Sequence, residues 1–246
     1  MQSRHELRER ILGAESIGAA VNVLAEVLSQ IGISSFATGY VAGAVHEPSG
    51  QWRKFEHQVI NFPKGWDDAW HLFSHHCPYY HACFDGRVGF DWATVRMRDV
   101  LTEHERKAWR YLADFGLIQG FTVPIHSPGH FGFVTVVGEA HDLSWAGRAE
   151  ANVASLLFFS HVYYEAVRER FPEVSQPSQS GLLSAREREC LGWVAAGKST
   201  DEVATILGLS IETVRIYLKR TMRKLDANTR SQAVAKAYRM GLFERR

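Results

Sequence analysis

The stretch that constrains this chain most is residues 210–225, SIETVRIYLKRTMRKL. Its apolar side chains recur every three or four positions, which is the spacing of one buried helix face: Ile211, Val214, Leu218, Met222 and Leu225. A second face carries five cations against one acid, Glu212: Arg215, Lys219, Arg220, Arg223 and Lys224. Ser210 stands just before the helix, where its hydroxyl can accept from the free amides of the first turn. The sequence therefore predicts one helix with a buried face and a basic face.

The preceding segment, residues 200–209, predicts a second and shorter helix. Ser199 or Thr200 can cap its start, and Gly208 suits the left-handed position at its end. Its expected buried residues are Val203, Ala204, Ile206 and Leu207. Two short helices joined by a tight turn, the second one basic, indicate a helix-turn-helix whose second helix lies in the major groove of DNA. The alternative is an ordinary solvated charged face.

Residues 181–246 resemble the LuxR-type DNA-binding domain along their whole length. The resemblance is carried by Glu187, Leu191, Gly197, the turn VATILGLS, Thr213-Val214, Lys224-Leu225 and Asn228-Thr229-Arg230. It implies that Arg215 and Lys219 reach base edges, and that four residues meet phosphates: Thr213, Arg220, Arg223 and Lys224. It also implies that the last helix, 229–240, takes part in a dimer.

The charge distribution divides the chain in two. Residues 181–246 hold 13 Lys and Arg against 7 Asp and Glu, a net charge of +6, whereas the rest of the chain holds 15 against 20, a net charge of −5. Between them, residues 172–181 read PEVSQPSQSG, a composition typical of a linker. We expect a ligand-binding domain over 1–171, a linker over 172–181 and a DNA-binding domain over 182–246.

The N-terminal part predicts an α+β fold. Helices are expected at 5–12, 16–31, 64–76, 102–116 and 144–171, and strands at 34–43, 54–62, 88–92, 120–126 and 131–138. This order lacks the alternation of βαβ units and favours an antiparallel sheet with helices on both faces, an α/β/α sandwich. Three cysteines, no signal peptide and no long apolar run predict a cytoplasmic protein without a membrane segment.

Residues 5–170 resemble the LuxR-type autoinducer-binding domain. The matching motifs are FPKGW at 62–66, Cys77-Pro78 followed by Trp92, GLIQGFTVPIH at 116–126, FGFVTVV and LSWAGRAEANVASLL. The resemblance implies a cavity, between the sheet and the helices on one side, that holds an acyl-homoserine lactone. The candidate ligand-binding residues are Phe62, Trp66, Trp70, Cys77, Tyr79, Trp92, Gly120 and Thr135. Trp66 matches the tryptophan that contacts the lactone, Trp92 an aromatic wall, and Gly120 a tight approach of the strand.

Three of these positions depart from the family pattern. Trp70 stands in place of a tyrosine, Phe62 lacks a hydroxyl group, and Cys77 replaces an aspartate that accepts from the amide of the signal. A buried amide without an acceptor costs roughly 1–3 kcal/mol, and a thiol is a weak acceptor. We therefore expect ordinary acyl-homoserine lactones to bind poorly, and the signal to be an unidentified analogue or unnecessary. The aromatic residues also suit a plain hydrophobic core.

Several alternatives stay open from the sequence. One segment is rich in possible metal or redox ligands: His71, His75, His76, Cys77, His81 and Cys83. The long helix 144–171 is a candidate dimer surface or a helix packed on both sides: Leu156, Leu157, Phe158, Phe159, Val162 and Tyr163. The expected partners are duplex DNA with a two-fold symmetric site, a second copy of the chain or a different regulator, and RNA polymerase if transcription is activated. No enzyme motif is evident.

Overall fold

The sheet has five antiparallel strands in the order β2-β1-β5-β4-β3. The computed structural model describes residues 4–42, 56–97, 101–127, 130–172, 182–240 and 242–243. The strands are β1 (Ser35–Ala42), β2 (Glu56–Ile60), β3 (Phe90–Asp91), β4 (Gln119–Ser127) and β5 (His130–Gly138). The predicted hairpin of β4 and β5 is confirmed, with Thr122 opposite Thr135. The expected loop between β1 and β2, and residues 173–181 of the expected linker, lie outside the described residues.

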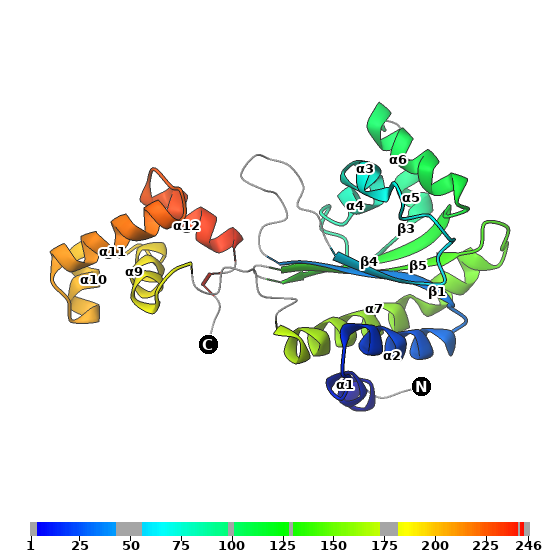
Figure 1. Ribbon diagram of the computed structural model, residues 1–246, viewed down its shortest axis with the longest axis horizontal. Helices are drawn as coiled ribbons and strands as arrows, with labels where there is room; N and C mark the ends of the chain where they lie inside the picture. The colour runs from blue at the N-terminus through cyan, green and yellow to red at the C-terminus, as the bar shows by residue number, and fades with distance from the viewer. Residues whose placement is uncertain are drawn as a thin grey trace.

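Helices cover both faces of the sheet, so the predicted α/β/α sandwich is confirmed (Figure 1). One layer holds α1 (Arg4–Leu12), α2 (Ile17–Ser29) and α7 (Trp145–Arg170). The other layer holds α3 (Trp70–Phe73), the 3-10 turn η1 (Ser74–His76), α4 (Pro78–Ala82), α5 (Trp92–Arg96) and α6 (Glu103–Asp114). Each face of the sheet packs its own apolar core against its helices. The two layers therefore leave the sheet buried on both sides.

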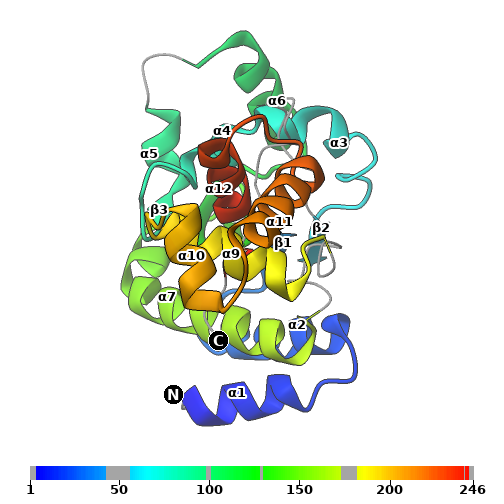
Figure 2. The ribbon, with the colours of Figure 1, turned by 90° about the vertical axis from the view of Figure 1, so that its left-hand side faces the viewer.

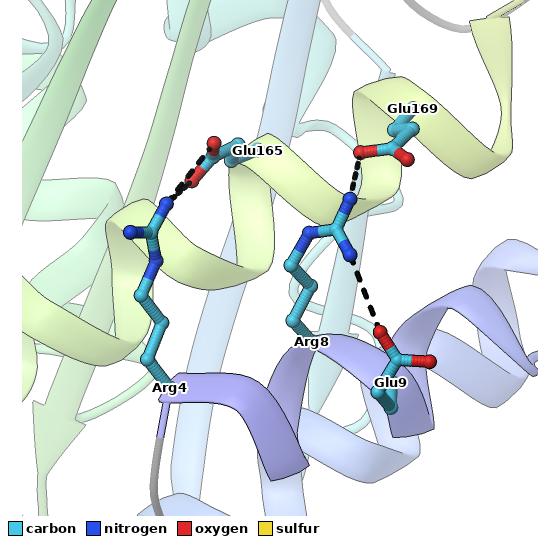
Figure 3. Close-up of polar contacts among 5 residues, drawn as sticks. All are labelled: Arg4, Arg8, Glu9, Glu165 and Glu169. Atoms are coloured by element: carbon cyan, nitrogen blue, oxygen red, sulfur yellow. Dashed lines mark hydrogen bonds and ion pairs between the residues drawn. The ribbon is translucent and has the colours of Figure 1, made fainter.

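The N-terminal helix α1 lies on the outer side of α7. Its apolar residues Leu7 and Ile11 are completely buried in the core of this layer. On its rim, Arg4 pairs with Glu165 at 3.0 Å and Arg8 pairs with Glu169 (Figure 3). These ion pairs are exposed and contribute little, so the apolar face holds the helix in place.

The expected helix at 64–76 is wrong in its first half. Residues 64–69 form turns, and regular helix begins only at Trp70. Gly65 takes a left-handed conformation with φ of +79°, and the Tyr111 hydroxyl donates to the carbonyl of Trp66 at 2.6 Å and accepts from the amide of Ala69 at 3.3 Å. A side chain distant in the sequence thus takes the backbone groups that a helix would have used. Local periodicity carries no sign of such a partner.

The expected strand at 88–92 is shorter than predicted, because Trp92 already begins α5. The carboxylate of Asp91 accepts from the amide of Ala93 at 2.6 Å and so caps the helix. Of the expected strand, only Phe90 and Asp91 pair with β4, and they form the edge of the sheet.

Most of the expected dimer surface on α7 is used inside the chain. Leu156, Phe159, Val162 and Tyr163 belong to the core against the sheet and the first two helices. Phe158 alone of the six is exposed, at 38%. The alternative of a helix packed on both sides is therefore the better description of these residues.

Within residues 182–240, which the structure describes, the C-terminal group consists of α9 (Ala185–Ala195), α10 (Thr200–Leu207), α11 (Ile211–Lys224) and α12 (Arg230–Arg239) (Figure 2). Ser199 caps α10, Gly208 ends it with φ of +65°, and Ser210 caps α11 by accepting from the amide of Thr213. The predicted helix-turn-helix geometry is confirmed. Ile206 and Ile211 were expected to be buried, but both are exposed. Among the described helices, none is both long and apolar enough to cross a membrane.

Candidate functional site

A small cavity opens between the sheet and the helices α3–α6. Its volume is about 70 Å³. Seven of the eight candidate ligand-binding residues line it: Phe62, Trp66, Trp70, Cys77, Tyr79, Trp92 and Thr135. Seven further lining residues were not singled out from the sequence: Ala37, His57, Tyr80, Cys83, Leu112, Thr122 and Phe133. The cavity is therefore enclosed chiefly by aromatic rings.

One wall of the cavity is a run of aromatic rings that follows β2. The Trp66 ring lies 5.0 Å from Phe62 and 5.4 Å from Trp70, measured between centroids. Tyr111 of α6 holds this wall, because its hydroxyl bonds to the backbone at Trp66 and Ala69 and its ring stacks on Phe73 at 4.5 Å. Sequence reasoning missed Tyr111, which acts from a helix 45 residues away from Trp66.

The opposite wall is Trp92, stacked on Tyr79 with centroids 4.0 Å apart and the two planes 9° from parallel. Gly120 does not line the cavity; it lies behind Trp92. A Cβ at Gly120 would stand 2.7 Å from two atoms of the Trp92 indole and 3.0 Å from the carbonyl oxygen of Val136. The expected close approach is thus a contact between the β4 backbone at Gly120 and the Trp92 indole. A side chain at residue 120 would clash with that indole.

Two threonine hydroxyls form the polar part of the floor. The Trp92 indole N–H donates to Oγ1 of Thr122 at 2.9 Å, and Oγ1 of Thr122 lies 2.9 Å from Oγ1 of Thr135. The two hydroxyl groups have one hydrogen each, and the hydrogen bond between them uses one of these two hydrogens. One O–H of the pair is therefore left to donate elsewhere, whichever hydroxyl holds it. Thr122 could have been found from the sequence, since the hairpin register sets it directly opposite Thr135.

Cys77 lies at the cavity with its thiol in the neutral form. Burial raises the pKa of Cys77 to about 11. Burial also raises the pKa of Cys83 well above its ordinary value. Among the lining residues described here, none carries a carboxylate, an ammonium or a guanidinium group. The cavity thus offers weak or neutral acceptors where the family pattern has a carboxylate.

The side chains of the histidine and cysteine segment have separate partners in the fold. His81 uses one ring nitrogen with Glu105, at 3.3 Å, and the other with the carbonyl of His75, at 2.9 Å. His76 instead faces His104 of α6, with ring centroids 4.7 Å apart. Within the described parts of the chain, no three His, Cys, Asp or Glu residues are placed to hold a metal ion.

The second candidate site is the exposed face of α11. Arg215, Lys219, Arg220 and Arg223 are all exposed, and Thr213 is half-buried next to the cap. Arg215 pairs along the helix with Glu212 at 3.1 Å. Val214, Leu218 and Leu225 are buried against the neighbouring helices of the group. The predicted division into a buried face and a basic face is confirmed for these residues.

Lys224 differs from the other cations of α11. Its ammonium group donates to Glu187 of α9 at 2.7 Å, and Glu187 is buried. The same carboxylate accepts from the backbone amide of Ser184 at 2.7 Å and so completes the capping box of α9. Burial raises the pKa of Glu187, but the bonds from Lys224 and Ser184 outweigh this effect and hold the pKa below its usual value. Lys224 therefore joins the first helix of the group to the third.

The fold and the two sites define a class: a sandwich domain with an internal cavity, followed by a basic helix-turn-helix. Residues 16–167 match the autoinducer binding domain, and residues 181–237 match the bacterial regulatory proteins of the luxR family. The chain belongs to the LuxR family of bacterial regulatory proteins, in its autoinducer-binding branch.

Individual regulators similar in sequence agree with this assignment. The quorum-sensing-dependent regulator RpaR of Rhodopseudomonas palustris is 35% identical over 53% of this chain and 51% of its own length. RhlR of Pseudomonas aeruginosa is 32% identical over 59% of this chain and 60% of its own length. The chain thus spans about half to three fifths of these relatives. The transcriptional activator LuxR of Aliivibrio fischeri is 28% identical, with 74% of this chain and 73% of that protein aligned.

The fold also matches a solved structure over its whole length. SdiA of Escherichia coli superposes with a TM-score of 0.68, at 20% identity, over 98% of both chains. At this identity the likeness concerns the fold alone.

Proposed function

We propose that this chain is a cytoplasmic, dimeric regulator of transcription that responds to a small molecule, and that its signal is not an ordinary acyl-homoserine lactone. The signal would occupy the aromatic cavity. Phe62, Trp66, Trp70, Cys77, Tyr79, Trp92 and Thr135 would line it, and Gly120 would seat Trp92. Binding would shift the population of the arrangement that is competent to bind DNA, without any chemical reaction.

The observation that carries the proposal is the neutral character of the cavity. Cys77 stands where the family pattern has an aspartate, and its raised thiol pKa keeps it neutral at physiological pH. An ionised acceptor contributes more to a hydrogen bond than a neutral one. An acyl-homoserine lactone buried here would leave its amide hydrogen with a weak acceptor, at a cost of roughly 1–3 kcal/mol. That cost corresponds to about 5- to 150-fold in affinity.

The test restores the carboxylate and measures stabilisation by a lactone. The Cys77→Asp variant should gain a larger melting-temperature shift than the unaltered protein when octanoyl-homoserine lactone is added. Because residue 77 is the N-cap of α4, an aspartate will also cap that helix and raise the melting temperature without any ligand. The shift caused by the lactone is therefore the quantity to compare. Strong lactone-dependent stabilisation of the unaltered protein would contradict the proposal.

For DNA, we propose that Arg215 and Lys219 contact base edges, while Thr213, Arg220, Arg223 and Lys224 meet phosphates. The exposed, cationic face of α11 supports this proposal, since phosphate contacts position a protein and base contacts specify the sequence. Lys224 also pairs with Glu187, so replacing Lys224 would change the stability of the C-terminal helices as well as the affinity for DNA. Two copies on a two-fold symmetric site would supply the surface that one small module lacks.

A ligand-independent partner that pairs with a different regulator is the alternative. Native mass spectrometry of the protein purified from its own cells separates the two. A mass of two identical chains, with or without a bound small molecule, supports the regulator proposed here. A mass that corresponds to this chain bound to another protein supports the alternative. RNA polymerase would be a further partner only if the regulator activates transcription.

A further inference from the structure

Ile216 stands near the centre of the exposed face of α11. Its side chain is 45% exposed, whereas Val214 and Leu218, two positions away on either side, are buried. A helix turns by about 100° per residue, so Ile216 points roughly opposite to the stripe that packs on α9. A partner that covers this face of α11 therefore also covers Ile216.

The surroundings of Ile216 are charged. Of its neighbours on the helix surface, Thr213 is half-buried and the charged ones are exposed: Glu212, Lys219, Arg220 and Arg223. A β-branched residue is a poorer helix former than Lys, Arg or Glu, so isoleucine gains nothing for the helix at an exposed position. A single exposed apolar residue is common on protein surfaces. This one, however, lies inside a ring that holds three cations, and that ring favours a polyanion as the covering partner.

We propose that Ile216 reads thymine: its side chain packs against the C5-methyl group of one thymine in each half-site. This inference rests on the proposed role of α11 in DNA binding. The major groove presents one apolar group on the bases of unmodified DNA, the methyl group of thymine. Arg215 precedes Ile216 and Lys219 lies one turn further along, so the cations would contact base edges on both sides of the apolar contact.

The experiment begins by selecting duplexes from a random library with the full-length chain at low salt, where phosphate contacts are strongest. Each thymine of the selected site is then replaced by deoxyuridine, which removes the methyl group and leaves the hydrogen-bonding edge unchanged. Dissociation constants are measured by fluorescence anisotropy. At one thymine per half-site the replacement should weaken binding by about fourfold, the effect of one buried methyl group.

The matched variants are Ile216→Ala and Ile206→Ala. Ile206 lies on α10 and is exposed to almost the same extent, 43%. Ile216→Ala should bind the thymine and deoxyuridine duplexes equally, whereas Ile206→Ala should keep the fourfold difference. A deoxyuridine penalty that persists in Ile216→Ala, or the absence of any such thymine, overturns the inference and leaves the DNA-binding proposal standing. If no duplex is enriched at all, the inference and the DNA-binding proposal both fall.

Discussion

Gly120 and Trp92 determine one wall of the cavity together. The indole lies so close to the strand that a methyl group on residue 120 would stand 2.7 Å from it. Gly120→Ala must therefore move Trp92 or the strand, and overpacking of this kind costs about 1–3 kcal/mol. For a domain of this size we expect the melting temperature to fall by roughly 2–4 °C per kcal/mol. Thermal unfolding monitored by circular dichroism measures the change.

The control is Gly147→Ala, at a glycine of α7 where an added Cβ meets nothing within 4 Å. Alanine is the better helix former, so this variant should be as stable as the parent or more so. Equal melting temperatures for Gly120→Ala and the parent would show that the wall can relax and that Gly120 does not determine the position of Trp92.

The pair of Lys224 and Glu187 predicts a dependence of stability on pH. Lys224→Met removes the cation and leaves a buried carboxylate with one partner fewer, a loss of roughly 1–3 kcal/mol. The pKa of Glu187 is lower in the folded chain than its ordinary value of about 4.5. The stabilisation that the Lys224–Glu187 pair contributes is therefore complete above about pH 4.5, the ordinary pKa of a glutamate, and is lost as the pH falls below that value.

Hydrogen exchange of the α9 and α11 amides, followed by mass spectrometry, reports on this domain alone. Protection should be lower in Lys224→Met than in the parent at pH 7, and the difference should shrink as Glu187 becomes protonated. Arg220→Met, an exposed cation with the same backbone setting, should leave protection nearly unchanged. A difference that stays constant from pH 7 to below pH 4 would contradict the assigned role of the pair.

At the scale of elements, the sequence predicted best those helices whose ends are marked by local chemistry. The capping box of Thr102 with Glu105 is present, with both of its bonds, and Gly116 follows α6 in a left-handed conformation. Ser210 and Gly208 mark the turn of the helix-turn-helix in the same way. Where a helix end depends on a side chain distant in the sequence, the prediction was wrong. Residues 64–69 form turns, and there the Tyr111 hydroxyl of α6 bonds to the backbone of Trp66 and Ala69.

The attachment of α1 provides a prediction at this scale. Leu7→Ala should destabilise the sandwich by about 2–5 kcal/mol, because the residue is fully buried against α7 and the cavity left behind would be only partly filled. Replacing Arg4 and Arg8 together by alanine should have little effect, since both ion pairs lie at the surface and salt screens them. Urea unfolding compares the two variants. A double arginine variant less stable than Leu7→Ala would reverse this assignment.

For the whole molecule, half of the residues that line the candidate site were predictable from the sequence, but the geometry of the site was not. Family motifs identified seven lining residues, yet the role of Gly120 as the seat of Trp92 and the hydroxyl pair of Thr122 with Thr135 depend on contacts across strands and helices. On α11, periodicity alone separated the buried Val214, Leu218 and Leu225 from the basic residues, although it also placed the exposed Ile211 on the buried face. It did not show that Lys224 would also pair with Glu187, because that partner lies 37 residues earlier.

The number of copies on DNA can be measured from salt dependence. The logarithm of the association constant falls with the logarithm of salt concentration, with a slope of about −0.9 for each phosphate neutralised. If Arg223 meets one phosphate in each of two copies, Arg223→Ala should reduce the steepness of this slope by about 1.8. Lys107→Ala, which removes an equal charge from α6 of the sandwich, should leave the slope unchanged. A reduction of about 0.9 would indicate one copy on the DNA, and an unchanged slope would show that Arg223 meets no phosphate.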